Sequence, residues 1–139
     1  MNDTPTRGER NNNPGNIDRD ATLWQGMASD QSGDDRFIIF TAPEFGIRAI
    51  GKELLSYYQK HGLNTVRGII NRWAPTVEND TGAYVNAVAN QCGVDPDDVI
   101  TPTNPDCMEN LIRGIIQHEN GRIIYDDALI VKSVDEALA

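Results

Sequence analysis

The sequence has no long apolar segment. Apolar runs such as Phe37–Phe40 and Ile123–Tyr125 are far shorter than the ~18 residues that suggest a membrane-spanning helix. The N-terminal stretch MNDTPTRGERNNNPGN also lacks the apolar core of a secretory signal. We therefore expect no membrane association, and delivery to a periplasm would need some other route.

Basic residues are scarce as well. The chain has 12 Lys and Arg against 21 Asp and Glu, a formal net charge of −9. Proteins that bind nucleic acid gain affinity when Lys and Arg displace counterions from phosphates. The one local group of basic residues, Arg7, Arg10 and Arg19, is interspersed with acidic residues. We expect no nucleic-acid partner.

Cysteine and histidine are limited to two of each: Cys92, Cys107, His61 and His118. Their spacing matches no zinc, redox or HExxH motif, so we expect no metal and no other cofactor. The cysteines are interpreted as small buried apolar residues, and a disulfide after export stays open. A Cys107–His118 nucleophilic pair is disfavoured, because eleven residues along one helix separate the two by roughly 16 Å.

The length of 139 residues is typical of one domain, which we expect over residues 7–139 after a flexible tail at 1–6. Residues 7–33 are rich in Asn, Gly and Asp, which predicts a loop-rich lobe. Phe37–Phe40 reads as a strand. The remainder shows helical spacing, so we predict a mainly α (α+β) fold of five to six helices with a small loop/β-lobe.

Local signals set the ends of the predicted helices. The helices are expected from a Thr41–Glu44 capping box to Gly62, from near Asn64 to Pro75, from Asp80 to Gly93, from Asn104 to Asn120, and in a short terminal helix capped by Ser133 and Glu136.

The helix from Asn104 carries the most informative residue, Glu119. Apolar residues follow one face at helical spacing: Met108, Leu111, Ile112, Ile115 and Ile116. Glu119 is the next position on that face. Partial burial and the negative end of the helix dipole both disfavour a charged carboxylate there. Such a residue can serve as the proton donor of a glycosidase, although a solvated helix end is an alternative interpretation.

Several segments resemble glycan-cleaving families of the lysozyme-like superfamily. One resemblance is to the autolysin-type N-acetylglucosaminidases, which have an Asn-Asn turn, a small β-lobe and a following helix. The matching motifs occur in the order Asn11–Ile17, Trp24–Gly26, Phe37–Phe40 and Pro43–Ile47. The resemblance implies that the Asn-rich turn and nearby aromatic residues bind sugars. The substrate-binding candidates are Asn11, Asn13, Asn16, Trp24 and Phe45.

Two further motifs resemble catalytic segments. Ala83–Val88 is similar to the Tyr-Val-x-x-Val helix of goose-type lytic transglycosylases, which implies a role for Tyr84 at the cleavage site. Ile115–Gly121 resembles the end of the helix that bears their catalytic Glu, and the His-Glu-Gly of phage-type lysozymes, in which Tyr and Asp follow as Tyr125-Asp126 do here.

Most of the chain resembles a phage and prophage virion-associated group that opens Arg-Gly-x-Arg-Asn-Asn-Asn-Pro-Gly-Asn-Ile. In the enzyme families the Glu helix precedes the Asn-Asn turn, whereas here it follows. We therefore expect a circular permutation, with the turn and Glu119 facing one cleft and the two termini near each other. Without permutation, Glu9 is the acid closest to the turn.

These observations favour a peptidoglycan-cleaving glycosidase, either a muramidase or a lytic transglycosylase. Its catalytic candidates are Glu119, Tyr84, Asp126 and Glu9, with Asp126 as the second carboxylate if water attacks. The expected partners are glycan strands and other virion proteins, and the expected location is a phage virion or the periplasm. The alternative is a non-catalytic virion module with the same fold.

Overall fold

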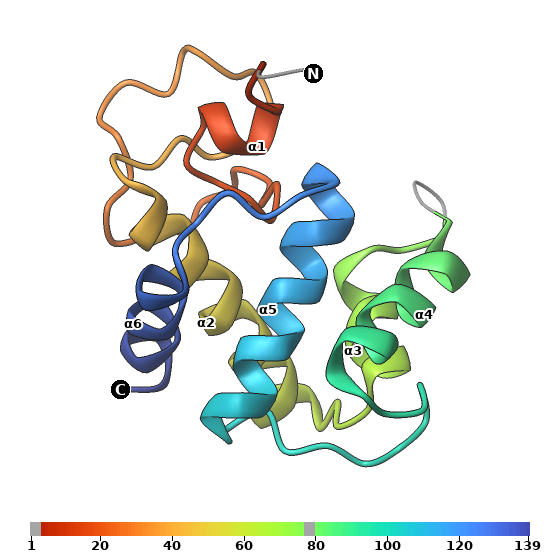
Figure 1. Ribbon diagram of the computed structural model, residues 1–139. Helices are drawn as coiled ribbons and strands as arrows, with labels where there is room; N and C mark the ends of the chain where they lie inside the picture. Colours follow the sequence, from red (N-terminus) through yellow and green to blue (C-terminus); the bar gives the residue numbers. More distant parts are fainter. Residues whose placement is uncertain (1–3, 77–79) are drawn as a thin grey trace.

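The computed structural model describes residues 4–76 and 80–139, and it confirms a mainly helical fold (Figure 1). The helices of the described residues are α1 (Arg7–Arg10), α2 (Pro43–His61), α3 (Val66–Trp73), α4 (Thr81–Cys92), α5 (Pro105–Asn120) and α6 (Asp127–Leu138). None of them combines the length and apolar character that a bilayer crossing requires.

The signals for helix ends were mostly interpreted correctly. Asn104 caps α5 by accepting hydrogen bonds from two backbone N–H groups, and Asp80 caps α4 by accepting one from Ala83. Gly62 and Gly121 end α2 and α5 in the left-handed conformation, with φ of 66° and 74°. This conformation suits glycine because it has no Cβ.

Three local predictions were wrong, and one short helix was not predicted. Thr41 caps nothing, and α2 begins after Ala42 without a side-chain cap. Ser133 does not start a helix: it is buried inside α6, where its hydroxyl donates to the Leu129 carbonyl. Phe37–Phe40 is extended but contributes only the isolated bridges Asp18–Phe37 and Met27–Phe40. The short helix α1 was missed, although Thr6 and Glu9 form a capping box.

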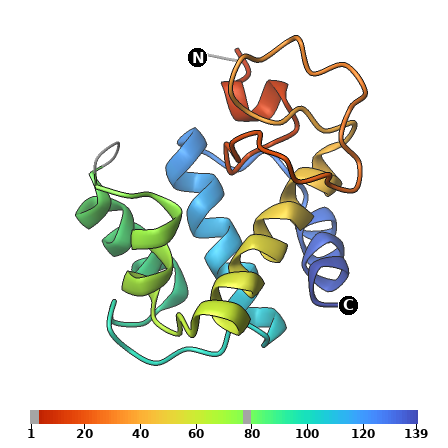
Figure 2. The same ribbon diagram turned by 180° about the vertical axis from the view of Figure 1, so that it is seen from behind.

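Helix α5 lies at the centre of the molecule. Figures 1 and 2 show α3 and α4 on one side of it, α2 and α6 on the other, and the N-terminal lobe across its C-terminal end. Its apolar face, predicted from Met108 to Ile116, is fully buried. Helices α2 and α6 approach closely, since a Cβ at Gly51 would lie 2.6 Å from the Cβ of Ala137.

Side-chain amides and one carboxylate organise the lobe in place of a sheet. The amide of Asn13, fully buried, donates to the carbonyls of Ile17 and Ile38 and accepts from the Ile17 N–H. Asn11 donates to Asp34 at 2.8 Å, and Arg7 forms a bidentate ion pair with the same carboxylate. These contacts hold the pKa of Asp34 well below its usual range.

The Asn11–Ile17 turn packs directly on α2. A Cβ at Gly46 would overlap the Asn12 carbonyl oxygen, so backbone touches backbone at this point. The end of the expected tail is also part of the fold: Thr6 donates to the Asn120 side chain at 2.6 Å, and the Thr4 carbonyl accepts from Arg122. Residues 1–3 lie outside the described residues.

Substitution of Gly46 tests this close approach. Gly46→Ala should destabilise the protein by at least about 3 kcal/mol, because neither backbone segment can move without disturbing buried contacts. Gly82→Ala is the matched control on an exposed helical position, where a Cβ would meet only Asp80 at 3.8 Å. It should change stability by less than about 1 kcal/mol, towards greater stability. Urea unfolding followed by circular dichroism measures both, and equal stabilities would contradict the packing.

Candidate active site

The carboxyl group of Glu119 lies where the end of α5 meets the N-terminal lobe. The residue is partly buried and lines a cleft that has a volume of about 430 Å³. The cleft wall also contains Gly15, Asn16 and Ile17. Glu119 therefore continues the apolar face of α5 into a cleft, and it faces the Asn-rich turn as expected.

Two donors from distant segments hold the Glu119 carboxyl. The Asn16 side-chain amide donates to Oε1 at 2.9 Å, and the Tyr84 hydroxyl donates to Oε2 at 2.8 Å. Asn16 has a φ of 50°, a left-handed conformation that asparagine tolerates better than most residues. The two contacts fix the orientation of the carboxyl group without enclosing it.

Tyr84 is both a core residue and a partner of Glu119. Its side chain is 1% exposed and does not line the cleft, while the ring stacks on His118 with centroids 3.9 Å apart. Burial and the Glu119 carboxylate raise the pKa of Tyr84, while a hydrogen bond with Trp73 acts in the opposite direction. The hydroxyl therefore stays protonated, and it can donate to a carboxylate or accept from a carboxylic acid.

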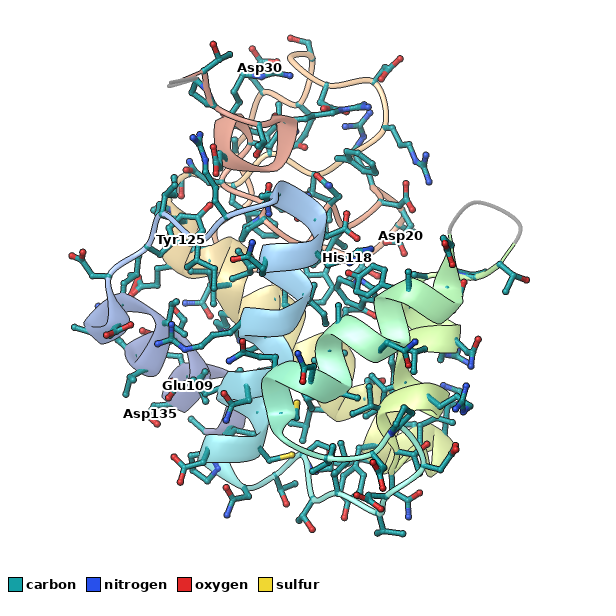
Figure 3. All side chains as sticks on the ribbon, turned by 45° about the vertical axis from the view of Figure 1, so that its right-hand side comes forward. Asp20, Asp30, Glu109, His118, Tyr125 and Asp135 are labelled. Atoms are coloured by element: carbon teal, nitrogen blue, oxygen red, sulfur yellow. The ribbon has the colours of Figure 1, made fainter. Side chains whose placement is uncertain are left out.

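The cleft runs between the lobe and helices α2 and α3, on the side where Asp20 and His118 lie in Figure 3. Its lining is rich in carboxyl, guanidinium and aromatic groups. The complete lining is Gly15, Asn16, Ile17, Asp18, Asp20, Arg36, Phe37, Glu53, Tyr57, Arg72, Trp73, Ala74, Pro75 and Glu119. No cluster of three metal-ligating side chains is found within the described part of the chain.

Glu9 has a structural role and does not line this cleft. Its buried carboxylate forms an ion pair with Arg122 at 2.6 Å and accepts from the Thr6 backbone N–H at 2.9 Å. The hydrogen bond with Arg122 lowers the pKa of Glu9. The structure therefore places Glu9 outside the cleft, with both carboxylate oxygens engaged by other residues.

Asp126 also lies away from the cleft. It is exposed at the N-cap position of α6 and makes no capping hydrogen bond through its side chain. The preceding residue, Tyr125, lies on the opposite side of α5 from His118 and Asp20 (Figure 3). The structure therefore does not bring Asp126 to the cleft that Glu119 lines.

Of the substrate-binding candidates, one lies at the cleft and the others lie away from it. Asn16 contacts Glu119, whereas Asn11 and Asn13 are buried and hold the lobe together. Trp24 and Phe45 pack against the core and are absent from the cleft lining. Phe45 occupies the space in front of Gly26, where a Cβ would overlap its ring.

Sequence reasoning missed the α2 wall of the cleft. Glu53 and Tyr57 lie one turn apart on α2 and line the cleft, next to Arg72 and Trp73 of α3. The Arg72 guanidinium lies 5.2 Å from the centre of the Tyr57 ring, and Trp73 meets the same ring edge-on at 6.5 Å. The available signal was a polar pair at i, i+4 spacing beside the apolar face of α2.

The positions of the chain ends match only part of what the expected circular permutation requires. The end of α5 does lie beside the start of α1, because Asn120 contacts Thr6 and donates to the Pro14 carbonyl at 2.8 Å. The last turn of α6, however, lies away from α1 in both views (Figures 1 and 2). The prediction that the two termini would lie near each other is wrong for the C-terminal end.

Removal of the Tyr84 hydroxyl should lower stability, in contrast to the same change at Tyr125. Tyr84→Phe deletes a hydrogen bond to a carboxylate, worth about 1–2 kcal/mol, or roughly 3–8 °C in Tm. The Tyr125 hydroxyl is buried without a hydrogen-bond partner among the described residues, so Tyr125→Phe should leave Tm unchanged or raise it. Differential scanning calorimetry measures both, and equal losses would contradict a specific Tyr84–Glu119 bond.

Comparison with known proteins identifies a phage family. No family model matches the sequence. Over 122 residues the chain is 40% identical to protein P5 of the Pseudoalteromonas phage PM2, covering 86% of this chain and 74% of the phage protein. The name of that relative states no activity. With this identity and coverage, the chain belongs to the family of phage protein P5.

Proposed function

We propose that this member of the phage protein P5 family is a peptidoglycan-cleaving glycosidase of the lysozyme-like kind, with Glu119 as its proton donor. The observation that carries the proposal is the placement of the Glu119 carboxyl, which Asn16 and Tyr84 orient while it remains open to a cleft of about 430 Å³. A proton donor must be both oriented and accessible to the leaving oxygen.

The volume and lining of the cleft suit a glycan strand. Its volume is within the range of roughly 300–1,000 Å³ that is typical of ligand sites. Phe37, Tyr57 and Trp73 offer aromatic surface to sugar rings, and Arg72 offers a cation to the carboxylates that peptidoglycan carries. The substrate would be the glycan strand of peptidoglycan, and the bond cut would be the one between N-acetylmuramic acid and N-acetylglucosamine.

The proposed chemistry begins with protonation of the leaving oxygen by Glu119. The bond between that oxygen and the anomeric carbon then breaks, and positive charge develops on the sugar. Because the Tyr84 hydroxyl can donate or accept, its contact with Oε2 persists as Glu119 loses its proton. The protein would act from a phage virion or after delivery to the periplasm, with glycan strands and other virion proteins as partners.

Glu119→Gln tests the proton donor. Glutamine can accept from Asn16 through its oxygen and donate to the Tyr84 hydroxyl through its nitrogen, so the fold should be retained. Loss of the transferable proton should reduce turnover by about 10²–10⁴-fold. Release of soluble fragments from purified peptidoglycan measures activity, and circular dichroism measures folding.

Asp126→Asn is the control, since it removes an exposed carboxylate outside the cleft and should keep turnover within about two-fold. Full activity of a folded Glu119→Gln variant would refute the assignment. A wild-type protein that binds peptidoglycan but releases no fragments would instead support a non-catalytic virion module.

Tyr84→Phe tests whether the Tyr84 hydroxyl positions the Glu119 carboxyl or whether Tyr84 serves only to pack the core. The ring remains in the core, but Oε2 of Glu119 loses its donor, so turnover of the folded variant should fall ten-fold or more, about 1.4 kcal/mol of barrier. Kinetic assays should be run well below the variant's Tm. Unchanged turnover would mean that Tyr84 contributes to packing alone.

A further inference from the structure

Besides Glu119, one other glutamate among the described residues lines the cleft: Glu53, which comes from a different helix. Glu53 lies on α2 and Glu119 at the end of α5, and both line the same cavity. Glu53 is partly buried, and the hydroxyl of Tyr57, one turn further along α2, interacts with it. The site therefore has a second acid, although not the Asp126 that the sequence suggested.

The other acidic residues of the cleft fit a catalytic role less well. Asp18 forms an ion pair with Arg36, and Asp20 is exposed and accepts from the backbone N–H of Thr22 at 2.8 Å. Burial, followed by the negative charge of Asp20, raises the pKa of Glu53, while Arg72 and Tyr57 act in the opposite direction. A base whose pKa lies closer to the working pH removes a proton more effectively.

Trp73 lies between the partners of the two carboxyl groups. Its indole meets the ring of Tyr57 on the Glu53 side and hydrogen-bonds with Tyr84 on the Glu119 side. In glycosidases that use water directly, the two carboxyl groups stand far enough apart, roughly 6.5–9.5 Å, for a water molecule to fit between the base and the sugar.

We propose that Glu53 is the general base of the cleft and activates a water molecule, so that the enzyme hydrolyses its substrate and does not form a 1,6-anhydro sugar. This inference rests on the proposed glycosidase function. Glu119 donates its proton to the leaving oxygen as the glycosidic bond breaks. The water oxygen bonds to the anomeric carbon, and Glu53 takes the proton that the water loses. The products are two glycan ends, one of them a reducing sugar of inverted configuration.

Digestion of peptidoglycan in H₂¹⁸O by the wild-type protein tests the nucleophile, with mass spectrometry of the fragments after borohydride reduction. We expect one ¹⁸O atom at each new reducing end and no anhydro product. Anhydro fragments without ¹⁸O would overturn this inference and leave the proposed glycosidase intact. A wild-type protein that releases no fragments would overturn both.

Substitution of Glu53 tests the base itself. Glu53→Gln and Glu53→Ala should each reduce turnover about 10²–10⁴-fold with little change in KM. Azide should restore cleavage by Glu53→Ala and yield a glycosyl azide, a product that a purely structural role would not give. Asp135→Asn, an exposed acid on α6 (Figure 3), is the control and should leave turnover unchanged. Full turnover in either Glu53 variant, or the absence of azide product, would overturn the assignment.

Discussion

The contact of the Asn11–Ile17 turn with α2 and with the end of α5 is the constraint on which the site depends. Gly46 lets the turn approach α2 without space for a Cβ, and Gly15 packs against Ile50 and Trp73 in the same way. The side chain of Asn120 then ties the turn to α5 through the Pro14 carbonyl. Because both helices are fixed to one short turn, the positions of Glu53 and Glu119 are fixed relative to each other.

The lobe achieves this rigidity with buried polar groups and very little regular structure. A buried amide or carboxylate is costly unless its hydrogen bonds are satisfied, and those of Asn13 and Asp34 are satisfied by several partners each. Such a network allows few alternative arrangements. Of the asparagines in the turn, Asn16 is the one that reaches the candidate proton donor.

The parts of the fold that sequence could predict are those set by local chemistry. The Asn104 cap, the apolar face from Met108 to Ile116 and the glycine stop place Glu119 at the end of α5, and these signals lie within one segment. The sequence could not show that Glu9 lies outside the cleft, because its surroundings depend on a distant residue, Arg122. Glu53 went unnoticed for the same reason: nothing in α2 alone shows that its polar pair faces a cleft built from the lobe and α3.

Contacts between the first and last parts of the chain also determine when the cleft can form during folding. Thr6 contacts Asn120, Glu9 pairs with Arg122, and Asn16 binds Glu119, so the two ends of each contact are separated by 103 to 114 residues. Contacts of such long range form late, because a large loop of chain must close first. During synthesis, the N-terminal lobe emerges from the ribosome long before its partners on α5. The carboxyl groups can therefore come together only after α5 has been synthesised, which makes assembly of the cleft a late step in folding.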